Sequence, residues 1–180
     1  MDNFIRVYEN AFSDELCERL INKFESTELE DRERHDMGEM HFSQVNFRAC
    51  GWKEEQEELV NIFLSHTKKY TDDVGITTEF PQKYALEDIR LKKYSPDGYD
   101  QFGPHVDVVD KNTSTRFLVF FVYLDDNISG GTHFDRINLT SPCKKGSILI
   151  FPPLWTHIHS GLKPIMKPKY IVGSYLHYVA

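Results

Sequence analysis

A histidine and an aspartate stand two positions apart in the stretch Gly103-Pro104-His105-Val106-Asp107. In an extended strand, residues i and i+2 point to the same face, so this imidazole and this carboxylate would converge on one point. They are two of the three groups in the two-histidine, one-carboxylate triad that holds Fe(II) and leaves coordination positions open. A turn-region histidine beside a solvated aspartate gives the same pattern, so the motif alone is a weak signal. The rest of the chain must supply a third ligand.

Two later histidines, His157 and His159, are candidates for that third ligand. They are also two positions apart, so an extended backbone puts both on one face, and parity does not choose between them. Two other histidines, His35 and His41, lie in or beside a charged stretch, and we interpret them as surface residues rather than ligands.

A lysine and a tyrosine suggest that an anion binds near these groups. Lys169 begins a strand that is otherwise apolar, and Tyr123 ends another strand, where a buried phenol needs a polar partner. A dicarboxylic cosubstrate would satisfy both: one end chelates iron and the distal carboxylate meets the ammonium and the phenol. Alternatively, Lys169 is a strand-end lysine that reaches solvent and Tyr123 is an ordinary core tyrosine. The anion-binding interpretation therefore depends on the consistent order of all the elements.

Helices come first among the elements that must position these residues. A short strand is predicted over residues 4–8, followed by an amphipathic helix that begins at the N-cap Ser13. A second helix is predicted from about Lys53 to Tyr70, with the run 54–58 on its solvated face. Residues 26–50 are charged without a clear period, and we interpret them as a mobile surface loop that could cover a substrate. The apolar face of the second helix comprises Leu59, Ile62, Phe63, His66 and Tyr70.

Strands follow the helices. They are predicted at 89–94, 115–124, 146–151 and 169–178, with a turn at 95–98 and a hairpin-like connection at 125–131. The run 115–124 is so rich in β-branched and aromatic residues that we expect burial on both of its faces. This order is typical of an α+β chain whose sheet closes into a barrel-like sandwich. An apolar wall that limits water is expected from Phe117, Phe121, Leu149 and Phe151.

Composition narrows the class of protein. A length of 180 residues, with 40% hydrophobic and 13% aromatic residues, predicts one folded domain spanning residues 1–180. The net charge of −7 argues against nucleic-acid binding, which needs a basic face, but leaves room for a local basic pocket. The three cysteines form no C-x-x-C pair and no disulfide framework is expected. No signal peptide or membrane span is recognised, so a cytoplasmic protein is expected.

The stretch from Tyr94 to Tyr178 resembles the 2-oxoglutarate/Fe(II)-dependent dioxygenases, specifically their prolyl 4-hydroxylase-like branch. The resemblance implies a double-stranded β-helix (jelly-roll, cupin-like) core over residues 86–180. It also implies N-terminal supporting helices and a substrate-cleft region over residues 1–85. The matching pieces are Tyr94 with its glycine-containing turn, His105-x-Asp107, Tyr123 to Asp126, Gly130 to Phe134, Pro142 to Phe151, His159, Pro164 and Lys169.

The same resemblance implies roles for single residues. The distal histidine of that branch precedes the basic cosubstrate-binding residue by about ten positions, which fits His159 and leaves His157 as a neighbour. The implied metal ligands are therefore His105, Asp107 and His159, and the implied 2-oxoglutarate-binding residues are Lys169, Tyr123 and Tyr94. The implied cofactors are Fe(II), 2-oxoglutarate and O2, with ascorbate as reductant.

The implied reaction is hydroxylation of a prolyl residue in a peptide or protein. The chain departs from the family pattern at three positions: Tyr175 replaces a common tryptophan, Val119 a threonine, and Ser129 an acidic residue. A hydroxylase of a free amino acid or small metabolite, and a non-catalytic module that binds metal or ligand, remain as alternatives. A zinc hydrolase would leave Lys169 and Tyr123 unexplained, and nucleic-acid demethylation fits poorly with the acidic chain.

Overall fold

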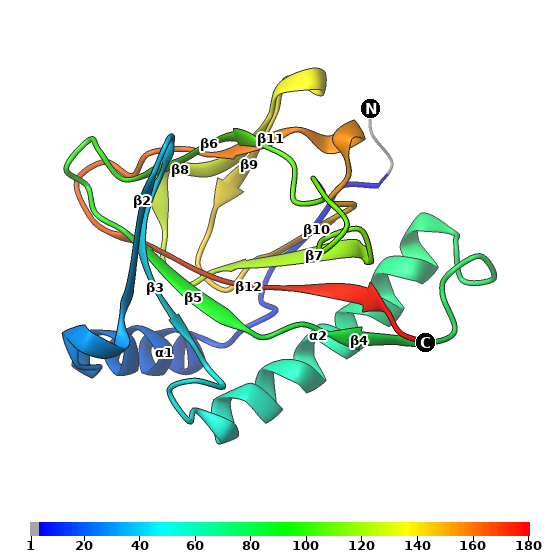
Figure 1. Cartoon of the computed structure of the whole chain (residues 1–180), viewed down its shortest axis with the longest axis horizontal. Helices are drawn as coiled ribbons and strands as arrows, with labels where there is room; N and C mark the ends of the chain where they lie inside the picture. The colour runs from blue at the N-terminus through cyan, green and yellow to red at the C-terminus, as the bar shows by residue number, and fades with distance from the viewer. Residues whose placement is uncertain (1–3) are drawn as a thin grey trace.

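The computed structural model describes residues 4–180 and places twelve strands of that range in one antiparallel sheet, with two α-helices packed below it in the view of Figure 1. The helices are α1 (Asp14–Ser26) and α2 (Lys53–Val74). The strands are β1 (Arg6–Tyr8), β2 (Glu33–Met37), β3 (Met40–Asn46), β4 (Tyr84–Leu86), β5 (Arg90–Tyr94), β6 (Gln101–His105), β7 (Arg116–Tyr123), β8 (Asn127–Phe134), β9 (Leu139–Cys143), β10 (Ile148–Phe151), β11 (His159–Gly161) and β12 (Lys169–Tyr178).

The sheet curls into a nearly closed barrel. Its main path runs β1-β10-β7-β12-β5-β3-β6-β11-β8-β9, with β2 added at β3 and β4 added at β12. The first five strands of this path lie next to the helices, and β6, β11, β8 and β9 form the opposite wall in Figure 1. This is the double-stranded β-helix predicted from the sequence, and the α+β class is confirmed.

Both predicted helices are present. Ser13 accepts a hydrogen bond from the Leu16 amide at 3.2 Å, as an N-cap does, and α2 ends at Gly75 in the left-handed conformation (φ 76°). The prediction for the run 54–58 was wrong at one position. Glu55 is buried, because its carboxylate accepts a hydrogen bond from Lys23 of α1 at 2.6 Å and so joins the two helices.

The predicted mobile loop at residues 26–50 is instead ordered structure, mainly the β2–β3 hairpin. The sequence hides this hairpin because the side chains of β2, an outer strand, are mostly exposed and show no apolar alternation. β3 is different, since it pairs with β5 and β6 and buries Phe42 and Val45. The hairpin therefore belongs to the barrel wall.

The surface interpretation of His41 was also wrong. His41 is 9% exposed, its Nδ1 lies 2.6 Å from Asp36 Oδ1, and its ring packs on Tyr99. His35 is half-buried and stacks on Phe42 with 4.7 Å between ring centroids. Neither histidine belongs to the metal-ligand cluster found in residues 4–180.

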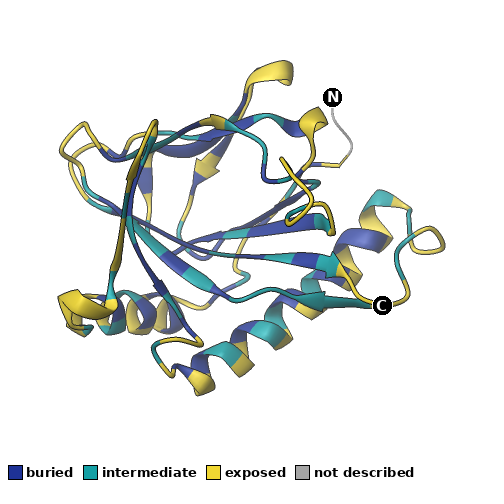
Figure 2. Ribbon diagram, viewed as in Figure 1, coloured by how far each residue is buried: buried dark blue, intermediate teal, exposed yellow. Residues whose placement is uncertain are grey.

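Two apolar clusters fill the molecule. One lies between the helices and the sheet, and the other lies inside the barrel and contains Leu149 and Phe151, with Phe121 packed against it. Figure 2 shows the buried positions gathered on the strands and on the sides of the helices that face them. Within residues 4–180, no helix combines the length and apolarity that crossing a membrane would require.

Phe117 does not join the predicted cavity wall. Its ring packs on Phe80, Tyr84 and Tyr178, on the helix side of the sheet. The reason is a register shift between β7 and β12, which pairs Leu118 with Leu176 and Arg116 with His177 and leaves Phe117 unpaired. A bulge of this kind interrupts the alternation of side chains, so a period of two fails at this residue.

Candidate metal and cosubstrate site

Two neighbouring strands bring the three predicted ligands together inside the barrel. β6 ends at His105 and β11 begins at His159, and the two strands pair so that His159 stands opposite His105. Asp107 follows two residues after β6. One nitrogen or oxygen atom from each of these residues lies within 4.8 Å of the other two, and this is the group in residues 4–180 with the geometry of a metal site.

Backbone carbonyls fix the orientation of both imidazoles. His105 Nδ1 lies 2.8 Å from the Gly103 carbonyl oxygen, and His159 Nδ1 lies 3.0 Å from the His157 carbonyl oxygen. Because a carbonyl only accepts, each Nδ1 carries the proton and each Nε2 keeps a lone pair. These Nε2 atoms lie 3.5 Å and 3.6 Å from the two carboxylate oxygens of Asp107.

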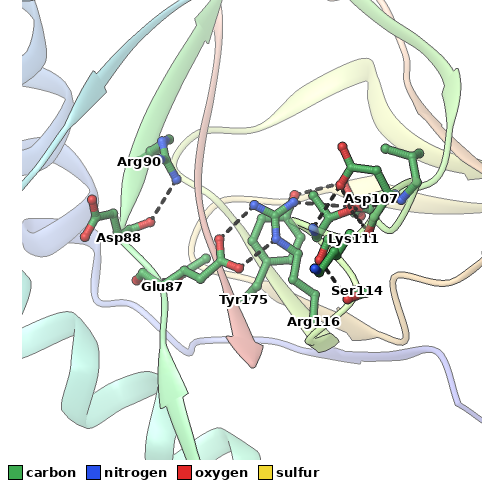
Figure 3. Close-up of polar contacts among 12 residues, drawn as sticks. Glu87, Asp88, Arg90, Asp107, Lys111, Ser114, Arg116 and Tyr175 are labelled. Atoms are coloured by element: carbon green, nitrogen blue, oxygen red, sulfur yellow. Dashed lines mark hydrogen bonds and ion pairs between the residues drawn. The ribbon is translucent and has the colours of Figure 1, made fainter. Parts of the chain in front are cut away.

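The Asp107 carboxylate is held by residues outside the triad. The Tyr175 hydroxyl donates to Asp107 Oδ1 at 2.8 Å, and Arg116 donates to the Asp107 backbone oxygen at 3.2 Å. Arg116 is itself clamped by Glu87 through bonds of 2.7 and 2.8 Å, and its guanidinium lies 4.1 Å from the Tyr175 ring centroid (Figure 3). The tyrosine that replaces the tryptophan common in this branch thus contacts a candidate ligand directly.

Electrostatics keep the cluster in the protonation state that binds metal. Burial raises the pKa of the Asp107 carboxyl, but the two histidines and Tyr175 outweigh burial and leave the pKa below its ordinary value. Burial lowers the pKa of His159 to about 4, against the opposing charge of Asp107. At neutral pH the carboxylate is therefore ionised and His159 is neutral.

The residues present fit an iron ion. In the described part of the chain, Asp107 Oδ2 and His159 Nε2 are buried without a hydrogen-bond partner. Buried polar atoms of this kind are rare unless a ligand or water satisfies them. Two neutral imidazoles and one carboxylate are the donor set of the non-haem Fe(II) triad.

His157, the other candidate for the third ligand, lies outside the cluster. It is buried, and its Nδ1 lies 2.7 Å from the hydroxyl oxygen of Thr156. Its backbone carbonyl accepts the proton of His159 Nδ1, so His157 supports the candidate ligand through its main chain.

The triad opens into a small cavity. The cavity is lined by the triad together with Lys92, Tyr94, Phe102, Phe121, Thr132, Gly161, Ile171 and Tyr175. Of the three residues predicted to bind 2-oxoglutarate, Tyr94 lines this cavity directly. Phe121 lines it as the predicted apolar wall requires.

Lys169 lies behind the cavity wall, next to the lining residues Tyr94 and Gly161, and its ammonium lacks a carboxylate partner within residues 4–180. It is 1% exposed, donates to the Leu162 carbonyl oxygen at 2.6 Å and lies 4.4 Å from the Tyr94 ring centroid. Burial lowers the pKa of Lys169 to about 8. A Cβ on Gly161, which lines the cavity, would lie 3.6 Å from the ammonium, so the Lys169 charge lies directly behind this glycine.

Tyr123 lies one residue behind the cavity surface. Its hydroxyl is 2.7 Å from the Thr132 hydroxyl and 2.9 Å from the Ser141 hydroxyl, and Thr132 is the residue that lines the cavity. A direct bond between Tyr123 and the cosubstrate stays a prediction.

The sequence analysis assigned no site role to several residues that line the cavity, among them Lys92, Phe102 and Thr132. Lys92 had a signal, since it stands two positions before Tyr94 on β5 and shares its face. Phe102 and Thr132 had none, because aromatic and β-branched residues are common on any barrel strand.

Comparison with known proteins agrees with the geometry. No protein-family model matches the chain. Among curated proteins, procollagen-lysine,2-oxoglutarate 5-dioxygenase 2 of Homo sapiens is 25% identical over 170 residues. The match covers 92% of this chain but 22% of the human protein, so the chain spans about a fifth of that relative.

Solved structures match over nearly the whole chain. The viral collagen prolyl hydroxylase of Paramecium Bursaria Chlorella virus-1, in complex with 2-oxoglutarate, has a TM-score of 0.70 at 20% identity, covering 98% of this chain and 97% of that one. A Pseudomonas putida prolyl-4-hydroxylase has a TM-score of 0.68 at 10% identity, covering 98% and 93%. A Trichoplax adhaerens prolyl hydroxylase, bound to a hypoxia-inducible-factor peptide, has a TM-score of 0.70 at 12% identity, covering 98% and 84%.

The chain therefore has the fold of the 2-oxoglutarate-dependent dioxygenases. Within that class it is similar to the prolyl 4-hydroxylase-like proteins, and the resemblance drawn from Tyr94 to Tyr178 is confirmed. The fold also occurs in SnoN, an α-ketoglutarate-dependent epimerase from nogalamycin biosynthesis, with a TM-score of 0.69 at 13% identity and coverage of 97% of this chain and 78% of that one. The fold alone therefore does not determine which reaction is catalysed, and the residues of the site must be considered.

Proposed function

We propose that the protein is an Fe(II)- and 2-oxoglutarate-dependent dioxygenase that hydroxylates a prolyl residue in a peptide or protein, with release of succinate and CO2. One observation carries the proposal: His105, Asp107 and His159 converge on a single point, within the fold of such enzymes, beside a buried lysine that lacks a carboxylate partner in residues 4–180.

Each side chain has a defined task in this proposal. His105, Asp107 and His159 hold the iron, and Tyr175 keeps the Asp107 carboxylate in place through its hydrogen bond. Lys169 and Tyr94 orient the distal carboxylate of 2-oxoglutarate, which contributes positioning rather than chemistry. The bound iron supplies the redox chemistry that couples decarboxylation of 2-oxoglutarate by O2 to oxygen insertion into a C–H bond. Phe121 and Phe151 exclude water.

The choice of a peptide substrate rests on the relatives. A neighbouring prolyl hydroxylase is bound to a peptide, which supports a peptide here. The curated relative carries lysine in its name, so a lysyl residue is the second candidate for the target. Hydroxylation of a free amino acid or small metabolite, and binding without turnover, are the outcomes that the test must separate from these.

The test combines two measurements on purified protein with Fe(II), 2-oxoglutarate and ascorbate, the proposed reductant. Succinate release must depend on Fe(II), and a library of proline- and lysine-containing peptides is searched by mass spectrometry for the gain of one oxygen atom. We expect the gain on proline. A gain on lysine alone would move the assignment to lysyl hydroxylation. Binding of Fe(II) and 2-oxoglutarate without succinate under any peptide would make the protein a binding module.

A further inference from the structure

Lys92 projects from β5 into the cavity that contains the triad. It also lines a small adjoining cavity, whose wall includes Arg90, Phe121 and Tyr175. The two cavities share Lys92, Phe121, Ile171 and Tyr175, so Lys92 borders both of them.

The Lys92 ammonium makes contacts with aromatic rings alone. It lies 4.7 Å from the ring centroid of Phe42 and 5.0 Å from that of Phe102. Across residues 4–180, no hydrogen-bond acceptor or carboxylate pairs with this ammonium. The adjacent Lys93 is different, because it points to the other face of β5 and pairs with Glu25 at 2.7 Å.

A lysine in this state calls for an anion. Lys92 is half-buried, and an ammonium that is partly withdrawn from water without a hydrogen-bonded counter-charge loses solvation free energy. Burial lowers the pKa of Lys92 to about 8, with the charge of Asp107 opposing that fall, so the side chain remains largely charged at neutral pH. The charge lies in a cavity rather than in the core, where an incoming ligand can neutralise it.

Phe102 places this charge next to the reacting centre. Its ring lies 3.8 Å from that of the candidate ligand His105, measured between centroids, and the same ring contacts Lys92. One side chain thus separates the ammonium from the metal centre. A group bound to Lys92 would belong to the residue that is being hydroxylated or to its neighbour.

Arg90 adds a second positive charge two positions earlier on the strand. It lines the second cavity, and its guanidinium has one hydrogen bond in the described chain, to the Asp88 carbonyl oxygen at 3.4 Å (Figure 3). The nearby Arg116 is satisfied by the Glu87 carboxylate instead. Lys92 and Arg90 therefore form a basic pair on the cavity wall.

The proposed use of 2-oxoglutarate leaves this pair unassigned, since one carboxylate chelates iron and the other meets Lys169. We propose that Lys92, supported by Arg90, binds a carboxylate of the substrate, so that the enzyme selects peptides carrying an acidic group beside the hydroxylated residue. This inference rests on the proposed function and adds the substrate class to it. An Asp or Glu side chain and a C-terminal carboxylate share the required chemistry.

Peptide binding tests the proposal without requiring turnover. The protein is loaded with Fe(II) and 2-oxoglutarate under anaerobic conditions, and fluorescence anisotropy measures its affinity for labelled proline-centred peptides. Three pools are compared: Asp or Glu beside the proline, Asn or Gln at the same positions, and the amide pool with a free C-terminal carboxylate in place of a C-terminal amide. We expect one acidic pool to bind at least tenfold more tightly than the neutral pool, and the two acidic pools identify the source of the carboxylate.

Three variants connect that preference to the residue. Lys92→Met keeps the length and the aromatic contacts but removes the charge, so the tenfold preference should vanish. Lys92→Arg should restore most of it. Lys93→Met, on the opposite face of the strand, is the matched control and should keep the preference in full. Melting curves establish that all three variants fold.

The outcomes separate this inference from the proposed function. Equal binding of all pools by the wild-type protein, or an unchanged preference in Lys92→Met, would overturn the role of Lys92 while leaving dioxygenase activity intact. A Lys92→Met variant that loses affinity for 2-oxoglutarate instead would assign the lysine to the cosubstrate. Failure of the wild-type protein to bind Fe(II) or 2-oxoglutarate would refute the proposed function itself.

Discussion

Lys169 is almost completely buried, and its ammonium lies directly behind Gly161, a residue of the cavity wall. Replacing it with alanine should raise the 2-oxoglutarate concentration needed for half-maximal succinate release at least tenfold, or about 1.4 kcal/mol. Lys167→Ala is the control, because that ammonium pairs with Asp125 on the surface. An unchanged requirement in Lys169→Ala would show that another residue anchors the cosubstrate.

The same burial gives Lys169 a measurable effect on stability. Its pKa falls from 10.5 to about 8 in the folded protein, so folding carries a penalty below pH 8 that disappears as the pH rises toward 10.5. At 1.36 kcal/mol per pKa unit, that penalty is about 3 kcal/mol at pH 7. Lys169→Met removes it. The measured quantity is the free energy of unfolding of Lys169→Met minus that of the wild type, from urea denaturation. This difference should be about 2 kcal/mol smaller at pH 10 than at pH 7. A pH-independent difference would contradict the shift.

Tyr175 shows how a residue that departs from the family pattern supports the site. Its hydroxyl donates to Asp107 Oδ1 at 2.8 Å, and hydrogen bonds of this kind orient metal ligands. Tyr175→Phe keeps the ring under Arg116 and should weaken metal binding about 10- to 100-fold, as measured by Co(II) titration. Tyr178→Phe lies on the same strand away from the triad and should leave the affinity unchanged. Equal affinity in both variants would assign Tyr175 a packing role.

The β2–β3 hairpin is fixed to the barrel by an ion pair with unequal burial. Asp100 is 1% exposed and receives two hydrogen bonds from Arg34 of β2, at 2.7 and 3.2 Å. Arg34→Ala leaves that carboxylate buried with the Ser95 amide as its remaining hydrogen-bond donor in the described chain, and should lower the free energy of unfolding by about 2 kcal/mol. Arg48→Ala breaks a pair between more exposed groups and should change it by less than about 0.5 kcal/mol. If urea denaturation shows a similar loss of the free energy of unfolding in Arg34→Ala and Arg48→Ala, then the Asp100 carboxylate finds hydrogen-bond donors without Arg34.

Elements with a strong apolar pattern were predictable from the sequence. β7 and β10 are buried on both faces, and their sequences are continuous apolar runs. α1 was predicted from its N-cap residue and from the helical spacing of its apolar residues. The β2–β3 hairpin was missed because its outer strand has no buried face to impose a pattern. The position of Phe117 was missed because a bulge depends on the partner strand, which the local sequence does not contain.

The site divides in the same way. His105 and Asp107 were proposed from their spacing of two, but β6 ends at His105 and Asp107 lies beyond it, so strand alternation alone does not account for their convergence. Strand parity left His157 and His159 open, and the choice of His159 came from the family resemblance; in the structure, β11 aligns His159 with His105 across the sheet. The sequence indicates that Lys92 shares a strand face with Tyr94. That its ammonium contacts the rings of Phe42 and Phe102 is known only from the three-dimensional structure.

Over the whole molecule, the sign of the charge differs between the surface and the cavity. The chain carries a net charge of −7, while Lys92 and Arg90 line the cavities of the barrel and Lys169 lies buried behind Gly161. Surface charges are screened over about 8 Å at physiological ionic strength, whereas buried charges act at short range with little screening. Net charge therefore argues against a broad phosphate-binding face and says nothing against an acidic ligand in the pocket.

Metal binding connects the site to the stability of the whole domain, because the triad joins β6, β11 and the segment after β6. A metal that binds the folded chain alone adds about 2.7 kcal/mol to the free energy of unfolding at 100 times its dissociation constant. For a domain of this size, that raises the melting temperature by about 5–10 °C. Co(II) is a redox-stable probe of this effect.

The melting temperature then tests the third ligand. His159→Ala should abolish the increase produced by Co(II), because it removes one of the three converging donors. His157→Ala should retain most of the increase, since the backbone carbonyl that holds His159 Nδ1 survives the substitution. Loss of the increase in His157→Ala alone would overturn the assignment and make His157 the ligand. The Co(II)-induced increase could also disappear in both variants. If isothermal titration then shows weakened rather than absent Co(II) binding in His157→Ala, the His157 side chain has a supporting role.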